Sequence, residues 1–284
     1  MILIEKTQVL GWEPTIRGMR NPMNSWAKSD SVFASLGTDD AHNLQGDFDW
    51  FTPSQEVGVT VGPNDLDLML RLAKAGPVDG KFRRMIAVYV DITAPLYWWK
   101  EFDTYKVGTV ANSCSTMHKI HAKEFTLEDF SYEHLLETEG EWIDIDNVDP
   151  YSFPALDSMD GMKIIVDMLN HHRRRFLETN DKKYWWQMIQ LLPSSYNQKR
   201  TVMLNYEVLA NIYQHRRNHK LDEWREVCRW IESLPYSEII TCNVAEKEKA
   251  NELKAALTKL RAENWSEEQI TNALRAWMAA QKDT

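Results

Sequence analysis

Residues 85–119, MIAVYVDITAPLYWWKEFDTYKVGTVANSCSTMHK, form the stretch around which we expect the fold to be organised. The stretch begins as a strand, because residues 87–92 form an apolar run rich in β-favouring side chains. Pro95 then stands where a first helical turn would begin, a position that tolerates its fixed φ and missing N–H. Apolar side chains recur at helical spacing after it: Leu96, Trp98, Trp99 and Phe102. A buried strand that leads into an aromatic helix is therefore predicted.

A small polar segment follows this helix. Gly108 interrupts the helical pattern, and hydroxyl and amide side chains come next: Thr109, Asn112, Ser113, Ser115 and Thr116. A polar loop beside a rigid core is a common location for ligand-binding residues. We therefore interpret residues 109–116 as a candidate binding loop.

Composition restricts the partners of the protein. The formal net charge of −9 over 284 residues argues against a protein that coats DNA or membranes, although it leaves room for a local basic site that binds an anionic small molecule. No apolar run approaches the roughly 20 residues of a membrane helix, and the first residues lack a signal-peptide pattern. The three cysteines lack metal-knuckle spacing. We expect a cytoplasmic protein with reduced cysteines and no metal site, and with neither a membrane nor a nucleic acid as partner.

Further elements are predicted from caps and periodicity. The part to about residue 60 is expected to be irregular, after which Asn64 caps an amphipathic helix that ends at Gly76 and Pro77. A short strand is expected over residues 200–204. The other expected helices cover residues 126–137, 161–179, 181–192, 221–234 and 244–263, and a last one starts at Ser266 with Ile270, Leu274 and Trp277 on its apolar side. The last two helices form a hairpin in a C-terminal extension, residues 244–284, which we separate from a main domain of residues 1–243.

One helix carries polar groups at both ends of an apolar face. Asn205, Leu209, Ile212 and Arg216 follow the spacing of four, three and four residues that places side chains on one helical face. The amide and the guanidinium are then about 16 Å apart along the helix axis. Two interpretations stay open. Either the two groups bind a ligand, or Asn205 is an N-cap and Arg216 complements the helix dipole.

Other charged groups also allow more than one interpretation. Arg17 and Arg20 suit a phosphate or carboxylate ligand, or they belong to a surface loop held by Trp26. The basic cluster at residues 171–175 complements the end of a helix, or it contacts phosphate or another subunit. The acidic segment 139–149 has alternating aspartates but lacks the glycine turn and the distal glutamate of a calcium loop.

Two segments resemble the flavin-dependent thymidylate synthases, the family that methylates dUMP with FAD and a folate. In that family an aromatic helix leads into the motif Arg-His-Arg-x-x-Ser-x-Asn-Glu-x-Ser-x-Arg-Tyr. Residues 104–118 are similar, with one extra residue between Thr109 and Asn112. A later helix of the family has Asn-Leu-Arg, with an arginine eleven places after the asparagine, and residues 205–216 match this spacing without a gap. The resemblance covers residues 64–234.

The resemblance implies a fold, a cofactor and a set of site residues. The fold is the α+β thymidylate synthase-complementing fold, with a central, mostly antiparallel sheet and helices, to which the C-terminal helical hairpin is added. The residues expected to hold FAD are Lys106, Thr109, Asn205 and Asn211, and those expected to hold the nucleotide dUMP are Asn112, Ser115, His118 and Arg216. A reduced folate is the implied co-substrate. The family forms tetramers with shared active sites, so a homo-oligomer is also implied.

Several residues depart from the family motifs. Met117 stands at the last arginine of the first motif, His118 at its tyrosine, Ser113 at its glutamate, and Glu207 at the arginine of the later helix. Met117 removes a fixed positive charge from the place where the family binds its anionic substrate, and a glutamate facing flavin phosphates is repulsive at short range. Lys106 keeps a charge but loses the two-pronged geometry of arginine.

Three hypotheses follow for the function. In the first, the protein is an active FAD-dependent thymidylate synthase, a methyltransferase that positions flavin against the pyrimidine without an obligatory protein nucleophile. In the second, it is a non-catalytic relative with a nucleotide-binding or interaction role on the same scaffold. In the third, these segments are helix packing in an unrelated helical protein. The first two require the loop that carries Asn112 and the helix face that carries Arg216 to meet at one polar cleft, across a subunit boundary.

Overall fold

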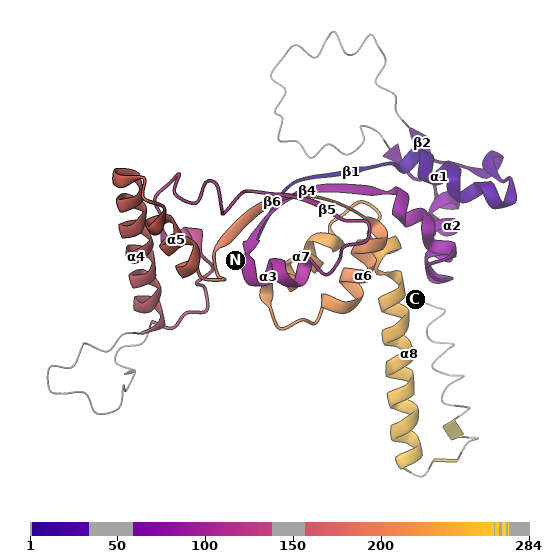
Figure 1. Cartoon of the computed structure of the whole chain (residues 1–284). Helices are drawn as coiled ribbons and strands as arrows, with labels where there is room; N and C mark the ends of the chain where they lie inside the picture. The colour runs from indigo at the N-terminus through magenta and orange to yellow at the C-terminus, as the bar shows by residue number, and fades with distance from the viewer. Residues whose placement is uncertain are drawn as a thin grey trace, which may run out of the picture.

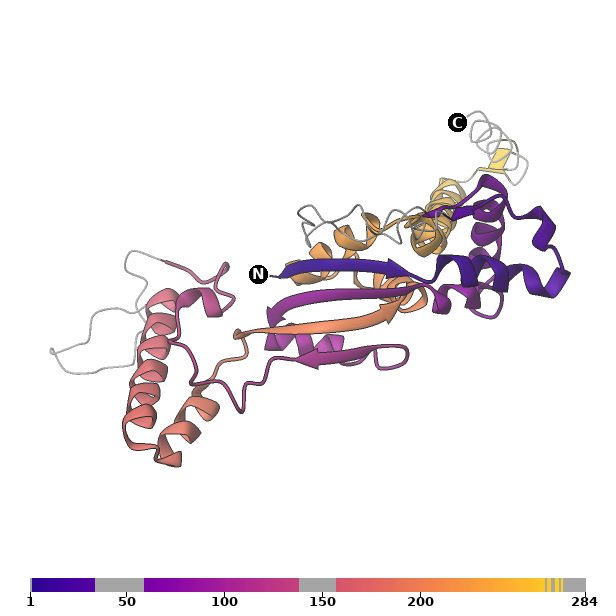
Figure 2. The ribbon, with the colours of Figure 1, turned by 90° about the horizontal axis from the view of Figure 1, so that it is seen from above.

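The structure is a computed structural model that describes residues 2–33, 59–137 and 157–263, together with residues 265, 266, 269, 270 and 272. The described chain is α+β, with a four-stranded antiparallel sheet at its centre and helices on one face of that sheet and at its ends (Figures 1 and 2). The expectation of an α+β protein with an antiparallel central sheet is confirmed. The acidic segment 139–149 lies outside the described residues.

The sheet has the strand order β1 (Leu3–Leu10), β4 (Ala87–Pro95), β6 (Asn197–Asn205) and β5 (Val110–Ser113). The inner strand β4 pairs with β6 over its whole length. Successive residues of a strand point to opposite faces of the sheet. Val88, Val90 and Ile92 are at most 1% exposed, whereas Tyr89 is 41% exposed. One face of the sheet therefore carries the core, and the other is more open.

Strand β4 leads directly into the aromatic helix α3 (Leu96–Phe102), as predicted. Pro95 is the N-cap of this helix rather than its first residue. Helices α6 (Tyr206–Arg216) and α7 (Asp222–Glu232) confirm two further predictions, and they lie with α3 along the same face of the sheet (Figure 1).

Aromatic side chains join these helices to the sheet. The ring centroid of Trp98 lies 4.8 Å from that of Trp99 and 4.8 Å from that of Trp224. All three rings are at most 1% exposed. Packing of this kind between tilted or edge-to-face rings adds to the free energy gained from burial. The tryptophan-rich stretch therefore serves the core.

The prediction of an irregular N-terminal part was wrong for the described residues. Strand β1 is followed by helix α1 (Trp12–Arg20), and β2 (Val32–Phe33) pairs with β3 (Val59–Thr60). Short 3₁₀ helices join α1 to β2, namely η1 (Asn21–Met23) and η2 (Trp26–Lys28). The apolar alternation of β1 is weak, and its partner β4 is distant in the sequence. Strand formation here depends on long-range pairing that local patterns do not reveal.

Arg20 has a structural role that neither of its two interpretations anticipated. Its Nε lies 2.6 Å from Oδ1 of Asp65, and the two side chains are 4% and 0% exposed. Arg17 is exposed and lies 3.9 Å from Glu13. Trp26 is 49% exposed, so it does not anchor the segment in the core. Arg20 therefore links the N-terminal segment to the helix that carries Asp65, and its guanidinium is already paired with a carboxylate.

Helix α2 (Pro63–Lys74) starts differently from the prediction. Gly62 is its N-cap, and Asn64 is its second residue. The carboxylate of Asp30 accepts hydrogen bonds from the backbone N–H groups of Asn64 and Asp65, at 2.9 and 3.1 Å. A side chain from a distant segment thus satisfies N–H groups that a local cap would otherwise take. The end of the helix falls where the glycine–proline pair predicted it.

Two predicted elements are altered by contacts with the sheet. The polar segment after Gly108 was expected to be a loop, but Val110–Ser113 is the edge strand β5 against β6. Residues 126–137 contain only the short 3₁₀ helix η4 (Leu127–Asp129). The chain then turns away from a helix because Phe130, which is fully buried, forms a bridge with Tyr196. Tertiary contacts of this kind override helix propensity.

Helices α4 (Ser158–Thr179) and α5 (Lys182–Leu191) confirm the predictions for residues 161–179 and 181–192. The side chains of Asp157 and Asp181 cap them by accepting backbone hydrogen bonds. The pair lies at one end of the molecule in Figure 1. It encloses a second, smaller core: Ile120, Phe125, Phe130, Met162, Val166, Leu169 and Met188.

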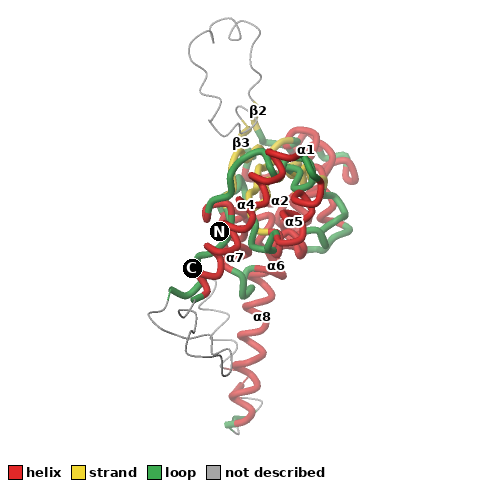
Figure 3. Tube along the Cα trace, turned by 60° about the vertical axis from the view of Figure 1, so that its left-hand side comes forward, coloured by secondary structure: helices red, strands yellow, loops and turns green. Residues whose placement is uncertain are grey.

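Helix α8 (Glu238–Ala262) was predicted to begin at residue 244 but begins at Glu238, because Ile239 and Ile240 belong to the main core. The proposed domain boundary at residue 244 thus falls inside one helix. Figure 3 shows α8 extending away from the rest of the described chain. Among the helices that the structure describes, none is long and apolar enough to cross a membrane.

The last predicted helix is described only at its start. Ser266 and Gln269 exchange the two hydrogen bonds of the predicted capping box, at 2.9 and 3.2 Å. Ile270 is 2% exposed. Leu274 and Trp277 lie outside the described residues, so the hairpin as a whole stays a prediction.

Candidate functional site

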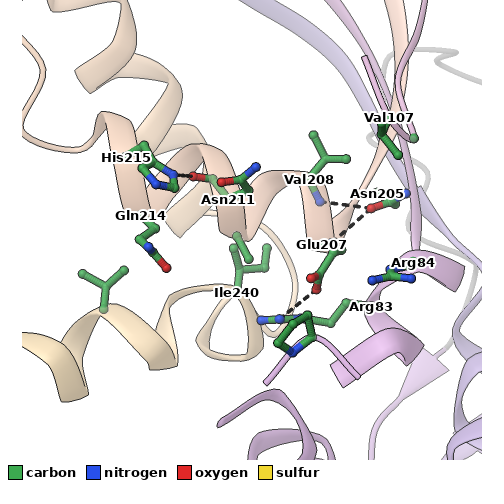
Figure 4. A pocket seen from close by; sticks show the side chains of 14 residues that line it. Arg83, Arg84, Val107, Asn205, Glu207, Val208, Asn211, Gln214, His215 and Ile240 are labelled. Atoms are coloured by element: carbon green, nitrogen blue, oxygen red, sulfur yellow. Dashed lines mark hydrogen bonds and ion pairs between the residues drawn. The ribbon is translucent and has the colours of Figure 1, made fainter. Parts of the chain in front are cut away.

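A cavity of about 500 Å³ lies between helix α6, helix α8, the turn after α3 and the 3₁₀ helix η3 (Asp79–Met85), which precedes β4 (Figure 4). Its polar wall comes from η3 and α6, and Ile240 and Val244 of α8 contribute apolar surface. Small-molecule sites typically occupy about 300–1,000 Å³ and combine apolar surface with a few polar groups. The cavity has the size and the mixed lining of such a site.

Asn205 lines the cavity and also caps α6. Its Oδ1 accepts hydrogen bonds from the backbone N–H groups of Glu207 and Val208, both at 3.1 Å. Its Nδ2 lies against Gly108, where an added Cβ would be only 2.9 Å away. The N-cap interpretation is therefore confirmed, and the NH₂ group is the part of this side chain whose donors the cap leaves unused.

Arg83 and Glu207 form a largely buried ion pair in the cavity wall. Arg83 is 3% exposed, and its Nη2 lies 2.7 Å from Oε2 of Glu207. Its Nη1 donates to the carbonyl of Ile239 at 3.3 Å. Glu207 Oε2 has no hydrogen-bond partner among the described residues, so its close contact with Nη2 lacks hydrogen-bond geometry. Arg83 Nε has no hydrogen-bond partner among these residues either. The glutamate that departs from the family motif is thus neutralised by an arginine, while buried polar atoms of both groups remain unsatisfied.

The outer part of the cavity carries exposed polar groups. Asn211, Gln214 and His215 follow one another along α6, and Nδ1 of His215 lies 2.8 Å from the carbonyl oxygen of Asn211. Arg84 lines the cavity from η3 (Figure 4) and is exposed. No ion pair or hydrogen bond of its side chain occurs within the part of the chain that the structure describes. Arg84 is therefore available to an anionic ligand.

Arg216, at the other end of α6, does not line this cavity. Its Nη1 lies 2.8 Å from Oε2 of Glu101, and its Nε donates to the hydroxyl of Tyr105 at 3.0 Å. The guanidinium also lies 4.8 Å from the ring centroid of Trp224. Since this side chain is 20% exposed, its charge is balanced mainly inside the chain. A nucleotide phosphate would have to compete with Glu101 for it.

The predicted flavin contacts Lys106 and Thr109 flank Val107 and Gly108, two residues of the turn that line the cavity. The Lys106 side chain is exposed. Thr109 Oγ1 is buried and lacks a hydrogen-bond partner among the described residues. The structure thus brings this turn to the same cavity as the two predicted asparagines of α6.

Asn112, Ser115 and His118 lie elsewhere, on the exposed edge of the sheet and the loop after it. The hydroxyl of Ser115 accepts a hydrogen bond from the backbone N–H of His118 at 3.0 Å. Within the described residues, no hydrogen bond or ion pair joins Asn112 to Arg216. The cleft expected between these two groups stays a prediction.

The basic cluster at residues 171–175 is largely engaged by contacts within the chain. Nε of Arg173 donates to the carbonyl of His121 at 3.0 Å, and Nη1 of Arg175 lies 3.0 Å from Glu178. Burial, and then the neighbouring imidazole of His171, lower the pKa of His172. These contacts account for the cluster without a ligand.

Arg83 and Arg84 were not identified as site residues from the sequence, where they only preceded the central strand. Whether an arginine is buried depends on tertiary packing and is not visible in a local pattern. One signal was available, however. Glu207 stands where the related motif has arginine, and a buried carboxylate requires a positive partner.

Comparison with solved structures finds similar folds. One belongs to the flavin-dependent thymidylate synthase ThyX from Helicobacter pylori, complexed with FAD and dUMP, with a TM-score of 0.53 and 13% identity over 83% of this chain and 95% of that chain. Another belongs to the UMP/dUMP methylase PolB from Streptomyces cacaoi, bound with 5-Br dUMP, with a TM-score of 0.50 and 12% identity over 85% and 95% of the two chains. No protein-family model matches the chain, and no curated protein sequence does. At this identity, the likeness establishes a ThyX-like fold and nothing finer.

Proposed function

We propose that this chain is a diverged relative of the flavin-dependent thymidylate synthases that binds a nucleotide, in the first place FAD, in the cavity between η3 and α6. The observation that carries the proposal is the meeting of Asn205, Asn211 and Arg84 at one cavity. The ThyX-like fold supports it, because the similar ThyX structure is complexed with FAD and dUMP.

The chemistry of the cavity suits such a ligand. The amide of Asn211 and the NH₂ group of Asn205 offer donors and an acceptor for the polar edge of a flavin or purine ring. A guanidinium such as that of Arg84 binds phosphate oxygens through parallel charge-assisted hydrogen bonds. When bound, a flavin would supply the redox chemistry, and the residues of the chain would bind and orient it.

Binding is tested with the purified full-length protein. We expect flavin absorbance near one FAD per chain, or a rise in melting temperature on addition of FAD or dUMP, because a ligand that binds only the native state must stabilise it. A colourless protein whose melting temperature does not change with either compound would refute the proposal.

As the finer part of the proposal, the chain methylates dUMP to dTMP with a reduced folate as co-substrate. Asn112, Ser115 and His118 of one chain and Arg216 of another would then hold the nucleotide substrate. The test is dTMP formation from dUMP, methylene-tetrahydrofolate and reduced FAD. Replacing Arg216 with alanine should weaken dUMP binding more than FAD binding, and equal losses would contradict this division of roles.

A second candidate is a non-catalytic nucleotide-binding or interaction protein on the same scaffold. One observation favours it, namely the ion pair between Arg216 and Glu101. The carboxylate of Glu101 would have to be displaced before Arg216 could bind a phosphate. Saturable FAD binding without dTMP formation would support this candidate. Recovery of a stable protein partner in the absence of any nucleotide would support its interaction form.

The proposal includes a homo-oligomer, a tetramer by resemblance to the family. The resemblance supports it, because the family shares its active sites between subunits. Size-exclusion chromatography with light scattering should give about four times the chain mass of 33.2 kDa. A monomer at all concentrations, with or without FAD, would contradict it.

A further inference from the structure

We propose that the contact between the loop of residues 114–125 and the helices α4 and α5 is sensitive to acid, and that protonation of His121 and His172 releases the loop. The same loop carries Ser115 and His118, which the resemblance assigns to dUMP. Acidification would therefore free the segment that is expected to hold the substrate. The release does not require a bound nucleotide.

Hydrogen bonds attach the loop to both helices. The amide of Asn170, on α4, accepts a hydrogen bond from the backbone N–H of Phe125 and donates one to its carbonyl, both at 2.8 Å. Nε1 of Trp185, on α5, donates to the carbonyl of Met117 at 3.1 Å. Asn170 is 7% exposed, so its two hydrogen bonds are shielded from water. The position of the loop therefore depends on its contacts with α4 and α5.

His121 lies between these attachments and packs against α4. Its carbonyl accepts a hydrogen bond from Nε of Arg173 at 3.0 Å, and its ring centroid lies 4.9 Å from that of Phe176. Nδ1 of the ring is buried and has no hydrogen-bond partner within the described part of the chain. Both nitrogens of an imidazolium are donors, so protonation would leave a buried, charged donor without an acceptor.

His172 has the same defect one helical turn before Phe176. The two residues are four apart in the sequence, so they share a face of α4. The ring of His172 stacks on that of Tyr184, on α5, with 6.3 Å between the centroids. Its Nδ1 is also buried without a hydrogen-bond partner among the residues that the structure describes. The two imidazoles thus belong to the contacts of α4 with the loop and with α5.

The charged groups around these contacts are mostly basic. Residues 114–125 and 171–186 contain, besides the two imidazoles, the following basic side chains: His118, Lys119, Lys123, His171, Arg173, Arg174, Arg175, Lys182 and Lys183. The ring centroid of His171 lies 5.3 Å from that of His172, and the guanidinium of Arg175 lies 5.4 Å from that of Tyr184. A charge on His172 would therefore be repelled by neighbours of the same sign.

The carboxylates of the same two segments are already paired. The pairs and their N–O distances are Glu178 with Arg175 at 3.0 Å, Asp181 with Lys183 at 3.0 Å, and Glu124 with Arg174 at 4.0 Å. Lys123 pairs with Asp129. Within the described chain, neither His121 nor His172 has a carboxylate partner, so nothing there compensates a charge on either ring.

The direction of the pH effect follows from the pKa of His172. Burial, and then the imidazole of His171, lower this pKa below its usual 6.5. A ring that is released into water binds the proton more readily than the packed ring does. The contact is therefore fully stable well above pH 6.5 and loses stability as the pH falls below that value.

Hydrogen–deuterium exchange of the full-length protein without ligand tests the proposal, at pH 8 and at pH 5.5, with rates corrected for intrinsic exchange. The amide of Phe125 reports on the loop, because its hydrogen bond to Asn170 exists only while the loop is attached. Its protection should fall several-fold at pH 5.5, whereas the amides of β4 and β6 should stay protected. Unchanged protection at Phe125, or an equal loss in β4 and β6, would overturn the proposal.

Variants assign the effect to the two imidazoles. His172→Phe and His121→Phe keep an aromatic ring in each place but cannot take up a proton, so each should reduce the acid-induced loss of protection. His134→Phe is the matched control, because the His134 side chain is 82% exposed and pairs with Asp222, and this variant should respond to acid as the wild type does.

An acid response of the same size in the wild type and in both test variants would overturn the proposal. His172→Gln and His121→Gln serve as a second pair, which replaces any phenylalanine variant whose melting temperature shows that it has not folded. The same comparison then applies to the glutamine variants, since glutamine does not titrate either.

Discussion

At the scale of single residues, Asp65 has the most connected side chain in the N-terminal part of the described structure. Its carboxylate accepts hydrogen bonds from the side chains of Arg20, Ser29 and Ser31, at 2.6, 2.7 and 2.6 Å. Asp65 is 0% exposed. Asp65 therefore holds the segment after α1 against α2, and α2 in turn packs against η3.

Replacing Asp65 with asparagine should destabilise the protein by about 3 kcal/mol, because it leaves the buried guanidinium of Arg20 without its counter-charge. The same change at Asp67, on the same helix, should cost less than about 1 kcal/mol, since Asp67 forms an exposed pair with Arg71. Urea denaturation of both variants measures the difference. Equal losses of stability would show that the buried pair contributes no more than the exposed one.

The same carboxyl group makes stability depend on pH. Burial would raise the pKa of Asp65, but the hydrogen bonds from Ser31, Ser29 and Arg20 outweigh it and lower the pKa below its usual 3.8. The unfolded chain therefore takes up the proton first as the pH falls, so the stabilisation is complete above the usual value and is lost below it. The stability gap between wild type and Asp65→Asn, measured by urea denaturation at pH 7 and at pH 3, should be smaller at pH 3. A gap that widens with acidification would contradict this sign.

At the scale of elements, the turn between α3 and β5 fixes one side of the cavity. The backbone of Gly108 has a φ of +79°, a value that residues with a side chain rarely adopt, and Gly108 packs against Asn205. Gly108→Ala should cost about 1 kcal/mol for the backbone alone and more for the 2.9 Å contact with Asn205 Nδ2, and it should weaken FAD binding. Gly161→Ala is the control, because the added methyl group meets nothing within 4 Å in α4 and should stabilise by up to about 1 kcal/mol. Thermal denaturation that ranks the two variants equally would contradict the account of the turn.

The elements predicted from the sequence are those whose signals are local. The strand before Pro95, the aromatic helix after it and the helices α4 to α7 follow from apolar periodicity and caps. Strand β1 and the cap supplied by Asp30 were missed because their partners are distant in sequence. The helix expected after Thr126 was lost to the contact between Phe130 and Tyr196. Long-range pairing thus decided each of these differences.

At the scale of the whole molecule, the sequence located half of the candidate site. The resemblance pointed to Asn205 and Asn211, and both line the cavity. It did not point to Arg83 and Arg84, because their role depends on the packing of η3 against α6. Arg216 was assigned to the substrate, yet within one chain it pairs with Glu101.

The central claim is that the cavity between η3 and α6 binds a nucleotide, and the most direct measurement is a crystal structure of the protein grown with FAD. The account predicts density for the cofactor in this cavity, with its phosphates at Arg84 and a polar ring edge within hydrogen-bond distance of Asn211. FAD bound at a different place, or a cavity without density at a saturating FAD concentration, would contradict it.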